Sequence, residues 1–302
     1  MALGSAKNSI ALARGGSTEP RYRPILKWAG GKSRLVAQIS AHLPSQMQTY
    51  FEPFMGSGAV FFALVSERRF TRAVLADINA ELVDVYRGVR KDVSAVIKLL
   101  EGYRRRHDEE AYYRTRERDP RTLDLVERAA RLIYLNKTGY NGLYRVNRAG
   151  QFNVPFGRYD NPAICDEPRL RAAAEALRRR GVSIEVADFE SVCENATAGD
   201  AVYFDPPYVP ASKTANFTAY HRDSFGPDEH VRLAQTFKRL TRKRVATVLS
   251  NSYGEETRRL YRAPGIELDR VLVARPINSK SSARGNVAEL IVSNRRAILK
   301  TR

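Results

Sequence analysis

The stretch Thr49-Tyr50-Phe51-Glu52-Pro53-Phe54-Met55-Gly56-Ser57-Gly58 decides the fold class of this chain. Its first six residues are rich in aromatic and β-branched types and predict a strand, and the last four form a glycine-rich turn. An apolar helix is expected to begin at 59–65, and a short second strand at 74–77 ends in Asp77, about twenty residues beyond the turn. This order of strand, glycine turn, helix and acid-tipped strand predicts an α/β sheet that binds the ribose of a nucleoside.

The glycine turn also restricts the kind of nucleoside. The sequence contains no GxxxxGK[ST] motif, which disfavours a triphosphate, and Met55–Gly58 does not fit GxGxxG, which disfavours a dinucleotide. A nucleoside cofactor without a pyrophosphate remains. Asp77 is expected to accept hydrogen bonds from both ribose hydroxyls.

A second apolar run also ends in polar and aromatic residues. Ala201–Phe204 predicts a buried strand, and Asp205-Pro206-Pro207-Tyr208 stands at its carboxyl end, where α/β sheets bind ligands. Both prolines lack an N–H, so their carbonyls and the Asp205 carboxylate offer acceptors to a flat, amino-bearing base, while Tyr208 offers a stacking face. The alternative interpretation is a plain turn that closes a core strand.

Composition and charge indicate which class of molecule the protein binds. Lys and Arg total 51 against 33 Asp and Glu, giving a net charge of +18, and most of the basic residues are Arg. Such charge is typical of nucleic-acid binding, although an Arg-rich proteome would also produce it. Cys165 and Cys193 are isolated and His is scarce, so neither a metal site nor a disulfide is predicted. With no long apolar segment and no secretory signal, we expect a cytoplasmic protein that binds nucleic acid and no membrane.

The chain divides into three parts. Residues 1–22 are predicted to be a disordered tail, 23–95 and 182–302 the catalytic domain, and 96–181 an inserted, mostly helical domain. Further elements are expected as a helix within 25–45 that starts at Gly30-Gly31, helices at 79–100, 121–136 and 227–241, strands at 182–187, 244–250, 266–275 and 288–295, and a polar loop at 209–226.

Six ordered blocks resemble a known family. Lys27–Lys32, Glu52–Gly58 and Asp205–Tyr208 resemble the motifs of α-class DNA N6-adenine methyltransferases. Leu135–Arg145, Gln151–Tyr159 and Thr214–His221 are similar to segments of the Dam type within that class. The likeness runs from about residue 23 to 295, essentially the whole folded chain.

The resemblance implies a Rossmann-like α/β sheet with helices on both faces, and transfer of a methyl group from S-adenosylmethionine to a flipped adenine of double-stranded DNA, within GATC, by a monomer. The matching catalytic positions are Asp205, Pro206, Pro207 and Tyr208. The matching cofactor positions are Trp28, Gly31, Lys32, Glu52, Pro53, Phe54, Gly56, Ser57, Gly58, Asp77, Asp188, Phe189 and Asp205. The matching DNA positions are Lys27, Tyr140, Asn141, Leu143, Arg145, Asn153, Pro155 and Tyr159.

The sequence departs from the family pattern at a few places in the recognition segment. Lys137 and Thr138 stand where the resemblance implies Arg-Tyr, and Tyr144 stands where it implies a small residue. These changes bear on flanking-sequence preference more than on the core site. One alternative is an N4-cytosine or RNA methyltransferase, which Asp rather than Ser at position 205 and the Dam-like segment 135–159 disfavour. The other is a catalytically idle DNA-binding regulator, which the intact Asp205–Tyr208 and Asp77 disfavour. Orphan, restriction-associated and phage enzymes share these motifs, so the motifs do not distinguish between them.

Overall fold

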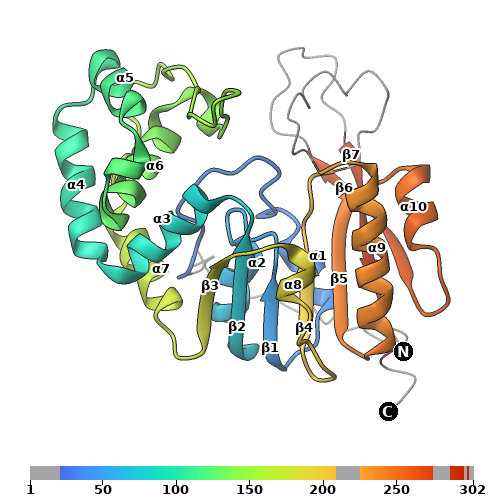
Figure 1. The fold of residues 1–302 in the computed structure, drawn as a ribbon. Coiled ribbons are helices and arrows are strands. Elements are labelled where there is room, and N and C mark those ends of the chain that lie inside the picture. The colour runs from blue at the N-terminus through green and yellow to red at the C-terminus, as the bar shows by residue number, and fades with distance from the viewer. Residues whose placement is uncertain (1–20, 209–224, 275–285, 296–297, 299–302) are drawn as a thin grey trace, which may run out of the picture.

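A computed structural model describes residues 21–208, 225–274, 286–295 and 298, and its centre is one mixed sheet (Figure 1). Seven strands in the described residues have the order β3-β2-β1-β4-β5-β7-β6. The first five in this order are parallel, and β7 is antiparallel to both β5 and β6. The predicted α/β class with a Rossmann-like sheet is confirmed. The predicted tail at 1–20, the block Thr214–His221 and most of the loop 209–226 lie outside the described residues.

The strands and helices follow one another in the usual alternation of an α/β protein. The strands are β1 Met47–Glu52, β2 Phe70–Asp77, β3 Val182–Val186, β4 Ala201–Phe204, β5 Ala246–Ser252, β6 Glu267–Ala274 and β7 Asn286–Ser293. The helices are α1 Val36–His42, α2 Ala59–Ser66, α3 Ala80–Lys91, α4 Val93–Arg105, α5 Glu109–Glu117, α6 Leu125–Thr138, α7 Glu167–Leu177, α8 Phe189–Val192, α9 Pro227–Arg242 and α10 Glu255–Tyr261, with 3-10 turns at Pro120–Thr122 and Tyr140–Gly142.

Alternation along the strands produces a core on each face of the sheet. Tyr50 of β1 and Tyr203 of β4 belong to one buried cluster, which α1, α2, α3 and α7 cover, together with helices of the insertion. Their chain neighbours Phe51 and Phe204 belong to the other cluster, which α8 and α9 cover. Because successive side chains of a strand point to opposite faces, strands buried on both sides must be apolar at nearly every position. No helix in the described residues is long and apolar enough to cross a membrane.

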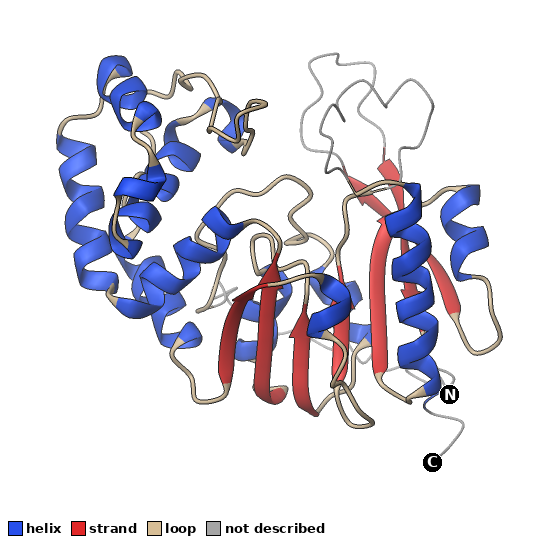
Figure 2. Cartoon of the chain, viewed as in Figure 1, coloured by secondary structure: helices blue, strands red, loops and turns tan. Residues whose placement is uncertain are grey.

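The inserted segment is helical, as predicted, and it packs on α3 (Figure 2). Asp84 of α3 forms an ion pair of 2.8 Å with Arg128 of α6, and Glu81 lies 3.5 Å from the buried Arg131. Arg131 also donates to the carbonyls of Thr115 and Arg116, so it ties three elements together. The boundary expected between residues 95 and 96 falls inside α4, and we place it instead at the junction of α3 and α4.

Three local expectations require correction. The helix after Gly30-Gly31 begins only at Val36, so these glycines lie in a loop and not at a helix start. The single helix expected over 79–100 is two helices, because Asp92 ends α3 and its side chain caps α4 through the backbone N–H of Ala95. The expected disordered tail is too long by two residues, since Arg21 and Tyr22 both bind the carboxylate of Glu175 on α7.

Two glycines in neighbouring helices test this packing. A β-carbon on Gly88 of α3 would lie 2.5 Å from the β-carbon of Ala129 and 2.8 Å from the Leu125 carbonyl oxygen of α6, whereas one on Gly102 of α4 would meet only the end of a flexible arginine at 3.5 Å. We expect Gly88→Ala to lower the free energy of unfolding by about 1–3 kcal/mol, because α3 and α6 must separate. Gly102→Ala should raise it by about 0.5–1 kcal/mol through helix propensity. Urea denaturation measures both, and equal effects would contradict the close crossing of α3 and α6.

Candidate active site

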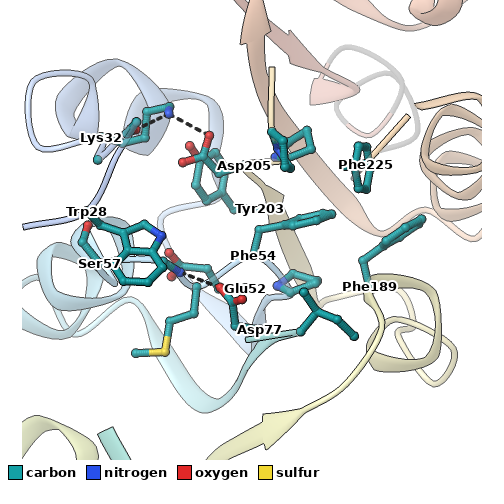
Figure 3. Close-up of a pocket in the computed structure, with 18 of the residues that line it drawn as sticks. Trp28, Lys32, Glu52, Phe54, Ser57, Asp77, Phe189, Tyr203, Asp205 and Phe225 are labelled. Atoms are coloured by element: carbon teal, nitrogen blue, oxygen red, sulfur yellow. Dashed lines mark hydrogen bonds and ion pairs between the residues drawn. The ribbon is translucent and has the colours of Figure 1, made fainter. Parts of the chain in front are cut away.

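A cavity of about 870 Å³ opens at the carboxyl ends of β1, β2 and β4 (Figure 3). It lies where the sheet order turns from β1 toward β2 on one side and toward β4 on the other, which is the position where open α/β sheets bind ligands. Every predicted cofactor and catalytic residue except Gly58 lines this cavity. Its lining also includes Ala29, Gly30, Met55, Ala59, Val60, Ile78, Ala187, Tyr203, Phe225 and Glu229.

The glycine turn and Asp77 form one wall. The backbone N–H of Gly56 donates to Asp77 at 3.1 Å, and the N–H of Asn79 donates to the other carboxylate oxygen at 3.0 Å. Burial raises the pKa of Asp77, and these two hydrogen bonds act in the opposite direction. Gly56 has φ +47°, and a β-carbon there would lie 3.0 Å from the ring of Trp28, so the turn must be glycine to let the indole approach. Gly58 caps α2 behind the turn with φ +68°.

An aromatic group forms the opposite wall. The ring centroid of Phe54 lies 5.5 Å from that of Phe189 in a stacked pair, and 5.5 Å from that of Phe225 at an edge-on angle. Asp188, which precedes Phe189, caps α8 through the N–H of Glu190 and forms an ion pair of 2.6 Å with Arg232. Asp188 therefore lines the cavity while its carboxylate also holds α8 to α9.

The tip of β4 carries a buried electrostatic network. The Lys32 ammonium, 6% exposed, lies 2.8 Å from Oδ1 of Asp205, and Ser250 of β5 donates to the same oxygen at 2.9 Å. Burial raises the pKa of Asp205, while the Lys32 charge and the two hydrogen bonds lower it. The ammonium also lies 4.6 Å from the ring centroid of Tyr208, whose hydroxyl donates to Glu289 of β7 at 2.5 Å. Pro206 is buried between these groups and Pro207 is exposed.

Glu52 ends β1 at the floor of the cavity. Its carboxyl is 2% exposed and accepts a hydrogen bond of 2.9 Å from the Tyr50 hydroxyl. Burial raises the pKa of Glu52 to about 8, with the nearby Asp205 charge adding to the increase. At neutral pH the ligand-free protein therefore holds Glu52 mainly in its protonated form.

The eight predicted DNA residues gather on the insertion and on the loop that leads into the cavity. Arg145 donates to the side chain of Asn153 at 2.7 Å and to its backbone carbonyl at 2.9 Å, across a short pairing of Val146 with Phe152. Tyr140 donates its N–H to Pro155, and its side chain is 54% exposed, unusual for so large an apolar group. The remaining members are the exposed Lys27, Asn141 and Leu143, and Tyr159, whose ring centroid lies 5.2 Å from the Lys27 ammonium.

Two contacts join this recognition surface to the cavity. The amide of Asn136 on α6 accepts from the Lys27 N–H at 2.9 Å and donates to the Lys27 carbonyl at 2.7 Å and the Gly142 carbonyl at 3.0 Å. The ring centroid of Tyr144 lies 5.3 Å from that of Trp28, which lines the cavity. The larger residue at 144 is therefore a packing partner of the cavity wall.

The sequence did not single out Asn136, Ser250, Glu289 or Phe225. Ser250 and Glu289 carried a partial signal, because each is a polar residue in a predicted strand, but their partners are far away in the sequence. His42, Glu267 and Asp269 place possible metal-ligand atoms within 4.8 Å of one another, and the two acids belong to the edge strand β6. The His42 ring there lies 3.2 Å from Ser293 and 3.6 Å from Asp269, as in an ordinary surface ion pair.

The protonated Glu52 makes stability depend on pH. Its pKa in the folded protein, about 8, exceeds the ordinary value of 4.5, so the folded state binds more protons and its stability falls as pH rises between these values. We expect the free energy of unfolding of the ligand-free protein to fall by ~2–5 kcal/mol from pH 5 to pH 8 through this group. Glu52→Gln, which imitates the protonated form, should remove that part of the decrease in urea denaturation. Glu185→Gln, at an exposed carboxyl of β3, is the control, and equal pH dependence in both variants would show that Glu52 is ionised at neutral pH.

Comparisons with known proteins agree with this geometry. The sequence pattern of the D12 class of N6 adenine-specific DNA methyltransferases matches residues 28–271. The type II methyltransferase M1.LlaDCHI of Lactococcus lactis subsp. cremoris is 40% identical over 90% of this chain and 95% of its own. The DNA adenine methylase of Escherichia coli K12 is 36% identical over 90% of this chain and 95% of its own. The solved rRNA methylase of Streptococcus thermophilus aligns with 86% of this chain and 94% of its own at 8% identity, and its TM-score of 0.36 is too low to carry an argument. The predicted family and enzyme class are confirmed: this chain belongs to the D12 class of N6 adenine-specific DNA methyltransferases.

Proposed function

We propose that this enzyme moves a methyl group from S-adenosylmethionine to N6 of an adenine that leaves the stack of duplex DNA, within the sequence GATC. The observation that carries the proposal is the Asp205 carboxylate, held at the rim of the cavity between Lys32, Ser250 and the Tyr208 ring. Carboxylate, proline carbonyl and aromatic face together form a recognition set for the amino edge of a base. Action as a cytoplasmic monomer stays a prediction from the sequence.

The cavity residues fit the cofactor, which when bound supplies an electrophilic methyl group on a sulfonium. Asp77 still has acceptor capacity on both oxygens for ribose hydroxyls, because each carboxylate oxygen accepts more than one hydrogen bond. The apolar wall of Phe54, Phe189 and Phe225 suits a flat purine. Trp28, packed against Gly56, and the buried Glu52 also line the cavity. Gly31, Lys32, Pro53, Ser57 and Asp188 complete the proposed cofactor wall.

The proposed chemistry relies on positioning. The N6 lone pair of adenine is delocalised into the ring, and hydrogen bonds from the amine to Asp205 and the Pro206 carbonyl favour a pyramidal nitrogen with a localised pair. That pair forms the new N–C bond while the S–C bond breaks and its electrons stay on sulfur. The nitrogen then releases one proton. Lys32 favours the ionised, accepting form of Asp205, and Glu289 fixes the plane of Tyr208 for stacking.

Recognition is proposed to come from the insertion. The amine of a stacked, paired adenine is not accessible to in-line attack, so the base must rotate out, and exposed apolar residues such as Tyr140 and Leu143 suit the gap that it leaves. Arg145 is oriented by Asn153, and an oriented guanidinium can bind O6 and N7 of a guanine together. Asn141, Pro155, Tyr159 and Lys27 are the further residues that we propose to contact DNA, and Lys27 lies over the ring of Tyr159.

Loss of the carboxylate should stop the reaction without preventing binding. We expect Asp205→Asn, which keeps the side-chain shape, to lower kcat by at least about 100-fold on GATC duplexes. DNA affinity in fluorescence anisotropy should change little, because the DNA surface lies on the insertion. Asp269→Ala, at an exposed carboxylate of the edge strand β6 that does not line the cavity, is the control and should keep full activity. Near-normal turnover by Asp205→Asn would refute the catalytic assignment.

Arg145 should carry sequence discrimination. Arg145→Ala is expected to reduce the preference for GATC over duplexes altered at one guanine by ~1–3 kcal/mol in kcat/KM. Arg148→Ala, at an exposed arginine three positions away in the same segment, should affect cognate and altered duplexes equally if it contacts only phosphates. The same uniform loss in Arg145→Ala would show that Arg145 does not read a base.

A further inference from the structure

Ser250 lies beside the Asp205 tip without lining the cavity. Phe204 of β4 is paired with Leu249 of β5, so the next residues along the two parallel strands, Asp205 and Ser250, are neighbours where the strands end. Ser250 is 0% exposed, and its hydroxyl lies 2.9 Å from Oδ1 of Asp205 and 2.8 Å from the hydroxyl of Tyr203. This buried serine is closed to solvent, and its hydroxyl has polar partners in Asp205 and Tyr203 and also interacts with Tyr208.

The direction of the two hydrogen bonds follows from the chemistry of the groups. An ionised carboxylate only accepts, so Ser250 must donate its single proton to Asp205. The serine oxygen then accepts from Tyr203, whose pKa burial raises well above its ordinary value, so that the phenol keeps its proton. The result is a directed chain from Tyr203 through Ser250 to Asp205.

Both described donors to Asp205 use the same oxygen. Lys32 and Ser250 lie 2.8 Å and 2.9 Å from Oδ1, one from the loop before α1 and the other from β5. We propose that Ser250 is a positioning residue that, together with Lys32, holds Oδ1 of Asp205 and thereby presents Oδ2 to the N6 amine of the target adenine. This inference rests on the proposed function.

The proposal predicts a loss of rate without a loss of binding. The lysine ammonium, which also donates to the Gly30 carbonyl, is a point charge that by itself imposes no plane on the carboxylate, whereas a second donor from a rigid strand does. Without Ser250 the carboxylate can turn about its own bond, and fewer bound adenines have the geometry for attack. Because Ser250 does not line the cavity, the affinities for cofactor and DNA should remain.

The pH profile separates this role from simple support of the fold. The charged and titratable groups that face Asp205 are Lys32 from the loop before α1, Glu289 from β7, Tyr50 and Glu52 from β1, and Tyr203 and Tyr208 from its own segment. The hydrogen bond from Ser250 lowers the pKa of Asp205. Removing this hydrogen bond should therefore raise the pKa of Asp205. The acidic limb of the profile of kcat against pH, where Asp205 becomes protonated, should then move to higher pH.

Steady-state kinetics of the full-length enzyme on GATC duplexes test the inference. For Ser250→Ala we expect kcat to fall about 10- to 100-fold, the usual effect of losing a hydrogen bond to a charged group, with KM for DNA and cofactor within about twofold. Tyr203→Phe should give a smaller decrease in kcat, because the Ser250 hydroxyl can still donate its hydrogen bond to Asp205. Ser293→Ala is the matched control, a buried serine on the adjacent strand β7 that pairs with Val248 and whose hydroxyl contacts His42 and Glu267, and it should retain the wild-type kcat and pH profile.

The outcomes separate the inference from the function on which it rests. Wild-type kcat in Ser250→Ala beside an inactive Asp205→Asn would overturn the role of Ser250 and leave the proposed function intact. Activity in both variants would refute the function itself. If kcat falls equally at every pH and the KM values rise, Ser250 only supports the fold. That result would also overturn the inference. If Ser250→Ala does not fold, Ser250→Cys fills the same space with a weak donor, and the same loss of kcat and shift of the acidic limb are expected.

Discussion

The parallel pairing of β1 with β4 is the constraint on which the site depends. These strands are separated by the whole insertion, yet Tyr50 pairs with Ala201 and Phe51 with Val202. Asp200, just before β4, reinforces the pairing by accepting the N–H of Thr49 at 3.0 Å. This register places the turn after β1 beside the acidic tip after β4, so the cofactor wall and the carboxylate that meets the base share one cavity. A slip by one residue would exchange the two faces of β4 and turn its core residues toward the wrong cluster.

A neighbouring positive charge allows the Asp205 carboxylate to be buried at the end of β4. An isolated carboxylate at the end of β4 would lose most of its hydration, and the usual response is a raised pKa and a neutral group. Lys32 supplies the opposite charge from a segment that precedes the whole sheet, and Tyr208 offers the same ammonium a π face. Glu52 has no such cation beside it and takes the other route, with a pKa of about 8. Burial raises the pKa of both carboxyl groups in this cavity, and the Lys32 charge opposes that increase at Asp205.

The insertion is connected to the cavity through side chains of its own core. Asn136 binds the backbone of Lys27 and of Gly142 together, and Tyr144 packs on Trp28. Lys27 and Trp28 are adjacent, so the same short loop contributes to the recognition surface and to the cofactor wall. The orientation of the proposed base-reading residues is therefore determined by the residues that shape the cavity, and a departure from the family pattern at position 144 is accommodated at that junction.

The sequence by itself determined the features that depend on neighbours along the chain. Runs of apolar residues, the glycine turn and the acids at 77 and 205 predicted the α/β class and the strand Ala201–Phe204, because strand, turn and helix signals are local. The family resemblance supplied the other predicted residues that line the cavity, such as Trp28 and Lys32. The same local reasoning failed at Gly30-Gly31, where a helical pattern was visible and the chain forms a loop so that Lys32 can reach Asp205. Only the tertiary structure decided that Ser250, Glu289 and Asn136 are partners of the site and that Glu52 is protonated. Hydrogen-bond partners and burial at these positions depend on strand register and helix packing between segments tens to hundreds of residues apart, which no local pattern encodes.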